Sequence, residues 1–161
     1  MQIYDILMKD HRTVMDIIQS IIKTPDAKKR KHMFSLVHTE LAMHARAEEE
    51  VFYNPLRERL RETNLIEESY DDHDEIDKLL AQLQASDAAD AEWMAKLLKL
   101  QTVLRNHIAT EEDDLFERAR KLFSEEEAEE IGVDMLSEKG KLGMPNPFTV
   151  AVKKVKELIS A

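Results

Sequence analysis

The chain contains no cysteine, which excludes disulfide bridges, thiolate metal sites, iron–sulfur clusters and cysteine nucleophiles. Three glycines and four prolines among 161 residues leave little material for the turns that a β-sheet architecture needs. No apolar run approaches the ~20 residues that span a bilayer, and charged residues interrupt the N-terminal segment, so a secretory leader is not expected. These absences predict a helical protein without a membrane partner, and we expect it in the cytoplasm.

Acidic residues outnumber basic ones, and the formal net charge is −10 at pH 7. Nucleic acids and anionic membrane surfaces repel such a chain, so we expect neither as a partner. Charged residues make up 35% and hydrophobic residues 43% of the sequence, which is typical of amphipathic helices. The length is that of one ordinary domain with a real core, and we expect a single domain over residues 1–161.

Apolar residues recur at helical spacing in several long segments. We expect four principal helices, over residues 3–22, 26–53, 64–83 and 92–123. Thr24 and Pro25 separate the first two, with Thr24 as the expected N-cap of the second. Pro55 lacks a backbone donor, so Asn54-Pro55 should break or kink the second helix. The sequence therefore predicts an all-α, up-down four-helix bundle with its core at about residues 3–123.

A C-terminal extension, residues 124–161, follows this core. Ser124 with Glu127 three positions later has the pattern of a capping box, which predicts a short fifth helix ending at about Lys139. Beyond it we expect a loop rich in glycine and proline and then a terminal amphipathic helix, over residues 140–147 and 150–160.

Histidine and glutamate residues recur in matched register in the two halves of the chain. In each half, a lone histidine precedes a second histidine that has a glutamate four positions after it. The first set is His11, His44 and Glu48, and the second set is His73, His107 and Glu111. Neighbouring residues keep the same register, since Asp10 recurs as Asp72 and Tyr53 as Phe116. Core packing alone does not explain this repeat, which predicts a two-metal site built by a duplicated helix pair.

Residues four apart on a helix lie on the same face, so each histidine–glutamate pair can reach one centre. Imidazole and carboxylate together suit iron, manganese or zinc better than calcium or magnesium, which prefer oxygen ligands only. With two bridging carboxylates, each metal would have two histidines and two glutamate oxygens, which leaves about two positions of an octahedron open. Ferritin-like carboxylate sites need Glu-x-x-His, and no histidine here has a glutamate three residues before it. The HExxH, P-loop and dinucleotide-binding patterns are absent as well.

The alternation of a lone histidine with HxxxE on four helices resembles that of hemerythrin-like, HHE cation-binding proteins. The stretches HARAEEEVFYNP and HIATEEDDLFERARKLFSEEEAEEIG are similar to the second and fourth helices of that family, and the resemblance covers about residues 3–139. It implies a non-haem centre of two iron ions, oxo- or hydroxo-bridged, with manganese or zinc as alternative metals. By this resemblance one iron would be bound by His11 and His44 and the other by His73 and His107, with Glu48 and Glu111 as bridges.

The oxygen carriers of that family have a second histidine on the third helix, four residues after the first, where this chain has Asp77. Two similar, open irons favour catalase-like turnover of hydrogen peroxide or oxygen, or sensing of iron and redox state, over reversible oxygen carriage. Three classes of function remain open. They are a redox enzyme acting on hydrogen peroxide, oxygen or nitric oxide, a module that binds or senses oxygen, iron or nitric oxide without turnover, and a helical protein that holds zinc structurally.

Tyr53, five residues after Glu48, is the candidate catalytic residue outside the ligand set. In relatives with peroxide-consuming activity, a tyrosine at this place approaches the irons. On an ideal helix its side chain points away from His44, so the sequence favours simple aromatic packing under the helix end. Glu49 and Glu112 are interpreted as part of a solvated face, with proton relay as the alternative.

Overall fold

The structure, a computed structural model, describes residues 1–141 and 154–159, and the regular structure of this part of the chain is entirely helical. The long helices are α1 (Ile3–Lys23), α2 (Ala27–Glu48), α4 (Asn64–Ala85) and α5 (Ala91–Thr110). The shorter elements are the π-helical turns η1 (Glu49–Tyr53) and η2 (Glu111–Leu115), and the helices α3 (Asn54–Arg59), α6 (Phe116–Leu122) and α7 (Glu125–Lys141). The predicted all-α class is confirmed.

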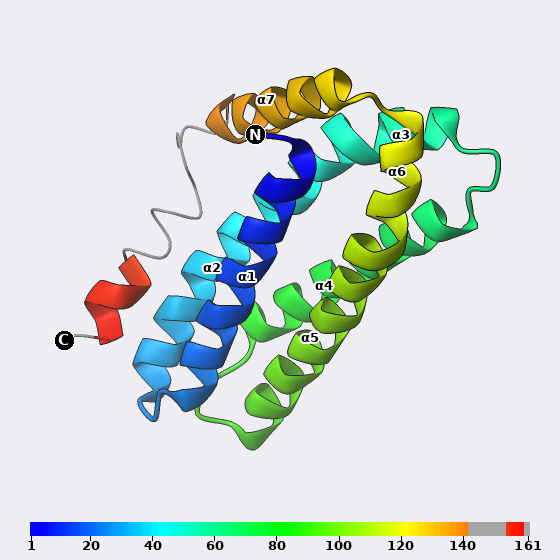
Figure 1. Cartoon of the computed structure of the whole chain (residues 1–161). Coiled ribbons are helices and arrows are strands. Elements are labelled where there is room, and N and C mark those ends of the chain that lie inside the picture. Colours follow the sequence, from blue (N-terminus) through cyan, green and yellow to red (C-terminus); the bar gives the residue numbers. More distant parts are fainter. Residues whose placement is uncertain (142–153, 160–161) are drawn as a thin grey trace.

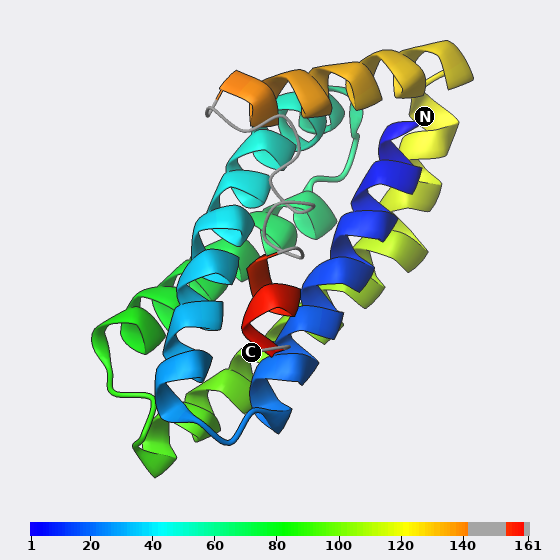
Figure 2. The same ribbon diagram turned by 90° about the vertical axis from the view of Figure 1, so that its left-hand side faces the viewer.

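The four long helices form an up-and-down bundle in which each helix contacts two neighbours (Figure 1). Helix α1 packs on α2 and α5, and α4 packs on the same two helices from the other side. At one end of the bundle α3 and α6 continue α2 and α5, and α7 crosses over α1 and α2 there (Figures 1 and 2). Short connections at the opposite end make sequential helices antiparallel, as the four-helix prediction required.

Two hydrophobic clusters fill the bundle, one toward each end. The cluster nearer the interhelical connections includes Ile17, Ile21, Phe34, Leu80 and Trp93. The cluster under α7 is rich in aromatic residues and includes Tyr4, Phe52, Tyr53, Phe116 and Met135. Burial of each large apolar side chain contributes about 1.5–3 kcal/mol. The two clusters therefore stabilise a bundle whose middle layer, between Leu7 and Val14 on α1, buries charged and polar groups.

The ends of the helices show which local signals act. Helix α2 is capped by Asp26, whose carboxylate accepts a hydrogen bond from the backbone N–H of Lys29 at 3.0 Å. The prediction of Thr24 as N-cap is therefore wrong, because Asp26 lies closer to the first turn and reaches its free donors. The capping box is confirmed, since Ser124 and Glu127 exchange side-chain to backbone hydrogen bonds at the start of α7.

The C-terminal extension is partly described. Helix α7 is the predicted fifth helix and runs to Lys141, slightly past its expected end. Most of the expected loop and the start of the terminal helix lie in residues 142–153, outside the described residues. Residues 154–159 are helical and bury Val155 against the bundle core. A search of the described helices finds none that is both long and apolar enough to span a membrane.

Candidate metal centre

A π-helical turn follows each histidine–glutamate pair. The backbone N–H of Asn54 bonds to the carbonyl of Glu49, and that of Phe116 bonds to the carbonyl of Glu111, five residues earlier in each case. These turns let α2 and α5 continue as α3 and α6 without a break. At the first of them, Pro55 lies in the opening turn of α3, where its missing N–H costs little. The interruption predicted at Asn54-Pro55 is therefore a widened turn within a continuous helix.

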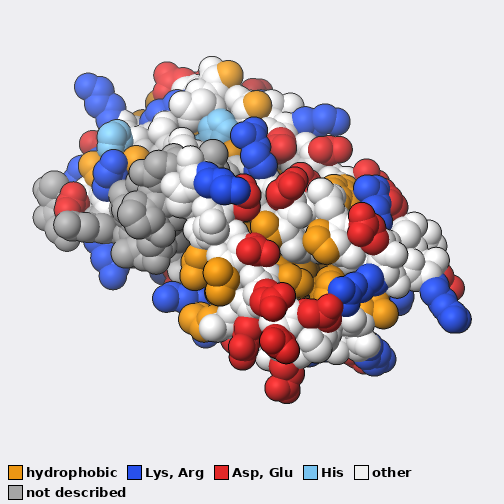
Figure 3. Space-filling model, turned by 90° about the horizontal axis from the view of Figure 1, so that it is seen from above, with side chains coloured by type: hydrophobic (Ala, Val, Ile, Leu, Met, Phe, Trp, Pro, Cys, Tyr) orange, Lys and Arg blue, Asp and Glu red, His pale blue; other side chains and the backbone are white. Residues whose placement is uncertain are grey.

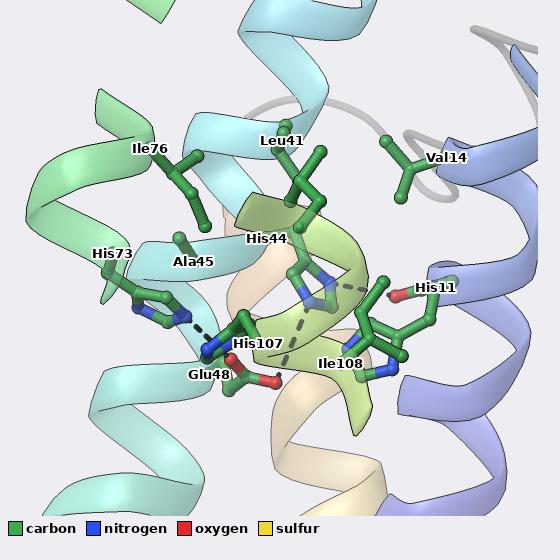
Figure 4. Close-up of a pocket in the computed structure, with 12 residues that line it drawn as sticks. His11, Val14, Leu41, His44, Ala45, Glu48, His73, Ile76, His107 and Ile108 are labelled. Carbon is green, nitrogen blue, oxygen red and sulfur yellow. Dashed lines mark hydrogen bonds and ion pairs between the residues drawn. The ribbon is translucent and has the colours of Figure 1, made fainter. Parts of the chain in front are cut away.

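Glu48, on α2, lies between histidines from different helices (Figure 4). Its Oε2 is 3.6 Å from Nε2 of His44 on the same helix, and its Oε1 is 3.1 Å from Nε2 of His73 on α4. The side chain is completely buried. The carboxylate of Glu48 thus directs one oxygen to His44 and the other to His73.

Glu111 has the same relation to the other two histidines. Its Oε1 is 3.1 Å from Nε2 of His11 on α1, and its Oε2 is 3.5 Å from Nε2 of His107 on α5. We call the pair His11 and His44 the N-terminal half of the centre and the pair His73 and His107 the C-terminal half. Each half therefore receives two imidazole nitrogens and one oxygen from each glutamate, and the structure brings all six predicted residues together.

Outer carboxylates orient all four imidazoles. Nδ1 of His11 and of His73 lies 2.7 and 3.0 Å from Glu112 and Glu49, the residues that follow the two central glutamates. Nδ1 of His44 and of His107 lies 3.1 Å from a carboxylate in each case, and these partners are Asp10 and Asp72. A proton on Nδ1 donates to the carboxylate, so the lone pair of Nε2 points into the centre, as metal-ligating imidazoles require.

When each imidazole carries its proton on Nδ1 alone, no ring nitrogen can donate a hydrogen bond to the central carboxylates. Both carboxylate oxygens of Glu48 and Oε1 of Glu111 are buried without a hydrogen bond among the described residues. Leaving buried charges unsatisfied is costly, so the site calls for positive charge at its middle. Two groups of three, which share Glu48, have donor atoms close enough to hold one cation each: His11 with His44, and His73 with His107. The residues present fit a two-cation centre.

In the metal-free protein the same buried negative charge raises the pKa values of His11, His73 and His107. Burial lowers the pKa of His11, but hydrogen bonds to Glu111 and Glu112 outweigh it and raise the pKa to about 10. Hydrogen bonds to carboxylates likewise outweigh burial at His73, whose pKa rises to about 9, and at His107, whose pKa rises to about 10. Protons therefore take the place of cations when no metal is bound.

The central carboxylates respond in the opposite direction. Burial raises the pKa of Glu48, yet its contacts with His44 and His73 outweigh burial and hold that pKa well below its usual range. The pKa of Glu111 is lowered as well, although burial and the charge of Glu48 oppose the shift. Both glutamates are therefore ionised at neutral pH, which is the form that binds a metal.

Tyr53 reaches the centre. Its hydroxyl donates a hydrogen bond to Oε2 of Glu111 and lies 3.3 Å from Nε2 of His107 and 3.5 Å from Nε2 of His73. The expectation of simple packing under the helix end is wrong, because η1 adds a residue to the turn and rotates Tyr53 inward. Burial, followed by the charges of Glu111 and Glu48, raises the pKa of Tyr53 well above its usual value, so the phenol keeps its proton.

Asp77, one turn after His73, is exposed and has no hydrogen bond or ion pair to the centre among the described residues.

The remaining side of the centre is a small apolar cavity. A cavity with about 20 Å³ for the centre of a water-sized molecule adjoins the histidines, which is room for about one water. Its apolar walls include Val14, Leu41, Ile76, Leu104 and Ile108, of which Val14, Leu41 and Ile76 are seen above Glu48 in Figure 4.

Sequence reasoning assigned no orienting role to four carboxylates and missed one lysine. Asp10 and Asp72 recur in register beside the lone histidines, and this recurrence was the available signal. Glu49 and Glu112 follow the central glutamates in the same way, but two adjacent acidic residues on a helix are ordinary on a solvated surface. The buried contact of Lys139 with Asp10 had no sequence signal at all.

Comparisons with known proteins identify the family of this chain. The model of the hemerythrin HHE cation-binding domain family matches residues 2–119. A protein of Nostoc sp. (strain PCC 7120) described as a DNA nickase is 29% identical over 142 residues, which is 88% of this chain. The chain spans only 40% of the length of that relative.

Among solved structures, the fold is similar to the crystal structure of a hemerythrin HHE cation-binding domain-containing protein, the Rv2633c homologue from Mycobacterium kansasii. The TM-score is 0.73 at 19% identity, and the match covers 96% of this chain and 99% of that chain. At this identity the likeness bears on the fold alone. Since the family match covers most of the chain and includes all six candidate ligands, the chain belongs to the family of hemerythrin HHE cation-binding domains.

Proposed function

We propose that the chain holds two iron ions and disproportionates hydrogen peroxide, converting two molecules of it into two molecules of water and one of oxygen. The observation that carries the proposal is the division of donors. Each glutamate directs one oxygen to each histidine pair, so both metals receive four protein donors. An octahedral ion with four protein donors keeps about two positions for solvent and substrate.

The exposed position of Asp77 supports turnover over reversible oxygen carriage. A carrier needs one iron that protein ligands saturate, beside one open iron. Here the position one turn after His73 holds an exposed aspartate, so neither half gains a further imidazole. Both iron ions then stay accessible to a small oxidant.

Iron, when bound, supplies a ferric–ferrous couple that accepts electrons from one peroxide molecule and returns them to another. The side chains hold and exchange the protons of the reaction. Tyr53 holds a proton at its hydroxyl, directed at Oε2 of Glu111, and its buried position keeps that proton at neutral pH. Glu49 and Glu112 are 33% and 27% exposed and contact His73 and His11, so they connect the centre with solvent for proton exchange.

Access to the centre runs between α1 and α5. A surface hollow lined by Met8, Arg12, Met15 and Glu112 shares His11 and Ile108 with the inner cavity. His11 and Ile108 therefore border both spaces. The apolar lining of the cavity and its size favour small, neutral molecules such as hydrogen peroxide and oxygen, and disfavour organic substrates.

A binding or sensing role without turnover is the second candidate. The observation in its favour is the contact of α7 with the centre through Lys139, Asp10 and His44. Through this chain of contacts, metal occupancy would influence how α7 docks on the bundle. Such a protein would bind iron, oxygen or nitric oxide and evolve no oxygen from peroxide.

Nucleic acid is not a partner in this proposal. The relative described as a DNA nickase contains more than twice the length that this chain matches, so its activity is not carried over. A formal charge of −10 repels phosphate backbones. We expect a supercoiled plasmid to stay intact with the purified, iron-loaded protein under conditions in which peroxide is consumed.

Oxygen evolution from hydrogen peroxide tests the proposed function. The iron-loaded protein should release one oxygen for every two peroxides, while the metal-free protein and the zinc-loaded protein release none. Asp77→His places an imidazole where carriers have one and should slow the reaction by occupying an open position. Reversible oxygen binding with no consumption of peroxide would replace this proposal by the carrier or sensor function.

A further inference from the structure

One buried cation lies against the centre from outside the four-helix bundle. Lys139, on the last turns of α7, is 3% exposed, and its Nζ forms an ion pair with Oδ2 of Asp10. The outer face of α7 instead carries exposed acidic side chains (Figure 3), which include Glu125, Glu126, Glu129, Glu130 and Asp134. Lysine is almost never fully buried unless it is paired, and Lys139 has the carboxylate of Asp10 in contact and the charge of the buried Glu40 nearby.

Close packing of α7 on α1 positions this lysine. A Cβ added to Gly132 would lie 2.3 Å from the carbonyl oxygen of Met1 and 3.2 Å from Cδ1 of Ile6, so the missing side chain allows the approach. Lys139 follows Gly132 by about two helical turns and therefore faces α1 as well. Both residues lie beyond residues 2–119, the part of the chain that matches the family.

The lysine and a ligand histidine meet at one oxygen. Oδ2 of Asp10 accepts the hydrogen bond from Nδ1 of His44 and also contacts Nζ of Lys139. In the C-terminal half, Oδ2 of Asp72 accepts the matching bond from Nδ1 of His107 at the same 3.1 Å. Within the described residues no lysine or arginine pairs with Asp72, whose side chain is 26% exposed against 11% for Asp10. Solvent faces Asp72 where Lys139 covers Asp10.

We propose that Lys139 is a positioning residue that draws the negative charge of Asp10 away from His44 and thereby makes the two metal positions unequal. The N-terminal half then binds its cation more weakly than the C-terminal half. The physical reason is that a carboxylate bonded to a ligating imidazole strengthens that ligand. An ammonium group on the same oxygen weakens this effect, and it acts strongly because the site is buried. The inference rests on the two-metal centre proposed above.

Titration of the metal-free protein with Co²⁺, followed by calorimetry and visible absorption, tests the inference. The natural protein should bind two Co²⁺ in two unequal steps. Lys139→Met keeps the length of the side chain and removes its charge, so it should tighten the weaker step about tenfold, a size typical of groups around metal ligands. Lys139→Arg, which keeps the charge, should leave both steps unchanged. The matched control is Lys141→Met, which alters an exposed lysine on the same helix.

The iron-loaded protein gives a second readout that a merely structural role would not move. Removing a positive charge favours the ferric form, so Lys139→Met should make the reduction midpoint more negative, while Lys139→Arg and Lys141→Met leave it in place. Circular dichroism and melting curves establish that each variant is folded. Lys139→Gln replaces Lys139→Met in both measurements if the methionine variant does not fold.

Tightening of one Co²⁺ step together with a more negative midpoint supports the proposal. Unchanged or weaker Co²⁺ binding in the folded neutral variants overturns it. Loss of a lysine that only holds the fold together could weaken metal binding but would not tighten it. If the natural protein takes up fewer than two Co²⁺, the centre itself is wrong, and the inference fails with it.

Discussion

The two halves of the centre have the same ligands and different surroundings. Each half has two imidazoles, one oxygen from each central glutamate, and one aspartate and one glutamate that orient the rings. The N-terminal half has Lys139 behind its aspartate, and the C-terminal half has the hydroxyl of Tyr53 beside its imidazoles. In the proposed two-metal centre the repeated helix pair would define the two metal positions, and Lys139 and Tyr53 make their surroundings different.

Tyr53 and its counterpart Phe116 show how a single atom produces part of this difference. Both follow equivalent widened turns, and both are completely buried. Phe116 packs against Tyr4 and Phe52 and has no polar group to offer the N-terminal half. The phenol oxygen of Tyr53, in contrast, reaches three groups of the centre.

Removing a bridge should have the largest effect, because it breaks both halves at once. Glu48→Ala or Glu111→Ala deletes an oxygen from each metal, so each variant should lose both metals. His11→Ala or His73→Ala deletes one donor from one metal, and these variants should retain about one metal per chain. Elemental analysis after reconstitution and desalting measures the difference. Equal loss from all four variants would show that the glutamates are not shared between the halves.

Metal removal should lower stability next most strongly, because the chelated protein loses the free energy with which the folded centre binds its cations. A ligand present at about a thousand times its Kd stabilises a fold by about 4 kcal/mol. For a chain of this size, that corresponds to a decrease in Tm of about 10 °C on chelation. Differential scanning calorimetry of loaded and chelated protein measures it, and coincident curves would argue against a buried metal site.

The chelated protein should also become less stable as pH rises. The pKa values of His11, His73 and His107 are raised to about 10, 9 and 10 in the folded, metal-free protein, above the ordinary value of 6.5. The stability that their protonation contributes is fully present below pH ~6.5 and is lost as pH rises through 9 to 10. Metal-loaded protein should not show this loss, so the difference in Tm between the two forms should widen from pH 7 to pH 10.

The outer glutamates allow a test of equivalence between the halves. Glu112→Gln weakens the support of His11, and Glu49→Gln weakens that of His73, and the two side chains are similarly exposed. Each substitution should reduce the affinity of its own half for metal by about tenfold and leave the other half unchanged. Stepwise Co²⁺ titrations measure both. A loss at both positions from one substitution would mean that the halves are not separately supported.

The smallest expected effect is that of the phenol. Tyr53→Phe removes one oxygen and no packing volume, so the protein should fold and take up metal normally. The rate of peroxide turnover and the visible spectrum of the iron-loaded protein should change, because the hydroxyl bonded to Glu111 is lost. Phe52→Tyr, which adds a hydroxyl elsewhere in the same aromatic cluster, is the control and should change neither.

Much of this site could be predicted from the sequence, because helical spacing and a matched repeat act locally. His44 with Glu48 and His107 with Glu111 lie one turn apart on any α-helix, and the buried layer between Leu7 and Val14 follows from apolar periodicity. The widening of the turn at η2 could not be predicted. The segment EEDDL of η2 contains no proline or glycine, so no local residue indicates that its turn has an additional residue.

The remaining differences depend on contacts between distant parts of the chain. The inward position of Tyr53 follows from η1, and the burial of Lys139 follows from the way Gly132 packs on the start of α1. Neither contact has a periodic pattern in the sequence. For the same reason Asp10 could be recognised as a repeated residue, but its partner on α7 could not.

The metal content of the reconstituted protein tests the central claim most directly. Iron should be added anaerobically to the chelated protein, and excess iron removed before elemental analysis and optical spectroscopy. Two metal positions that share Glu48 and Glu111 predict two irons per chain, together with visible charge-transfer absorption after oxidation. One metal per chain, or uptake of zinc with no uptake of iron, would contradict the account.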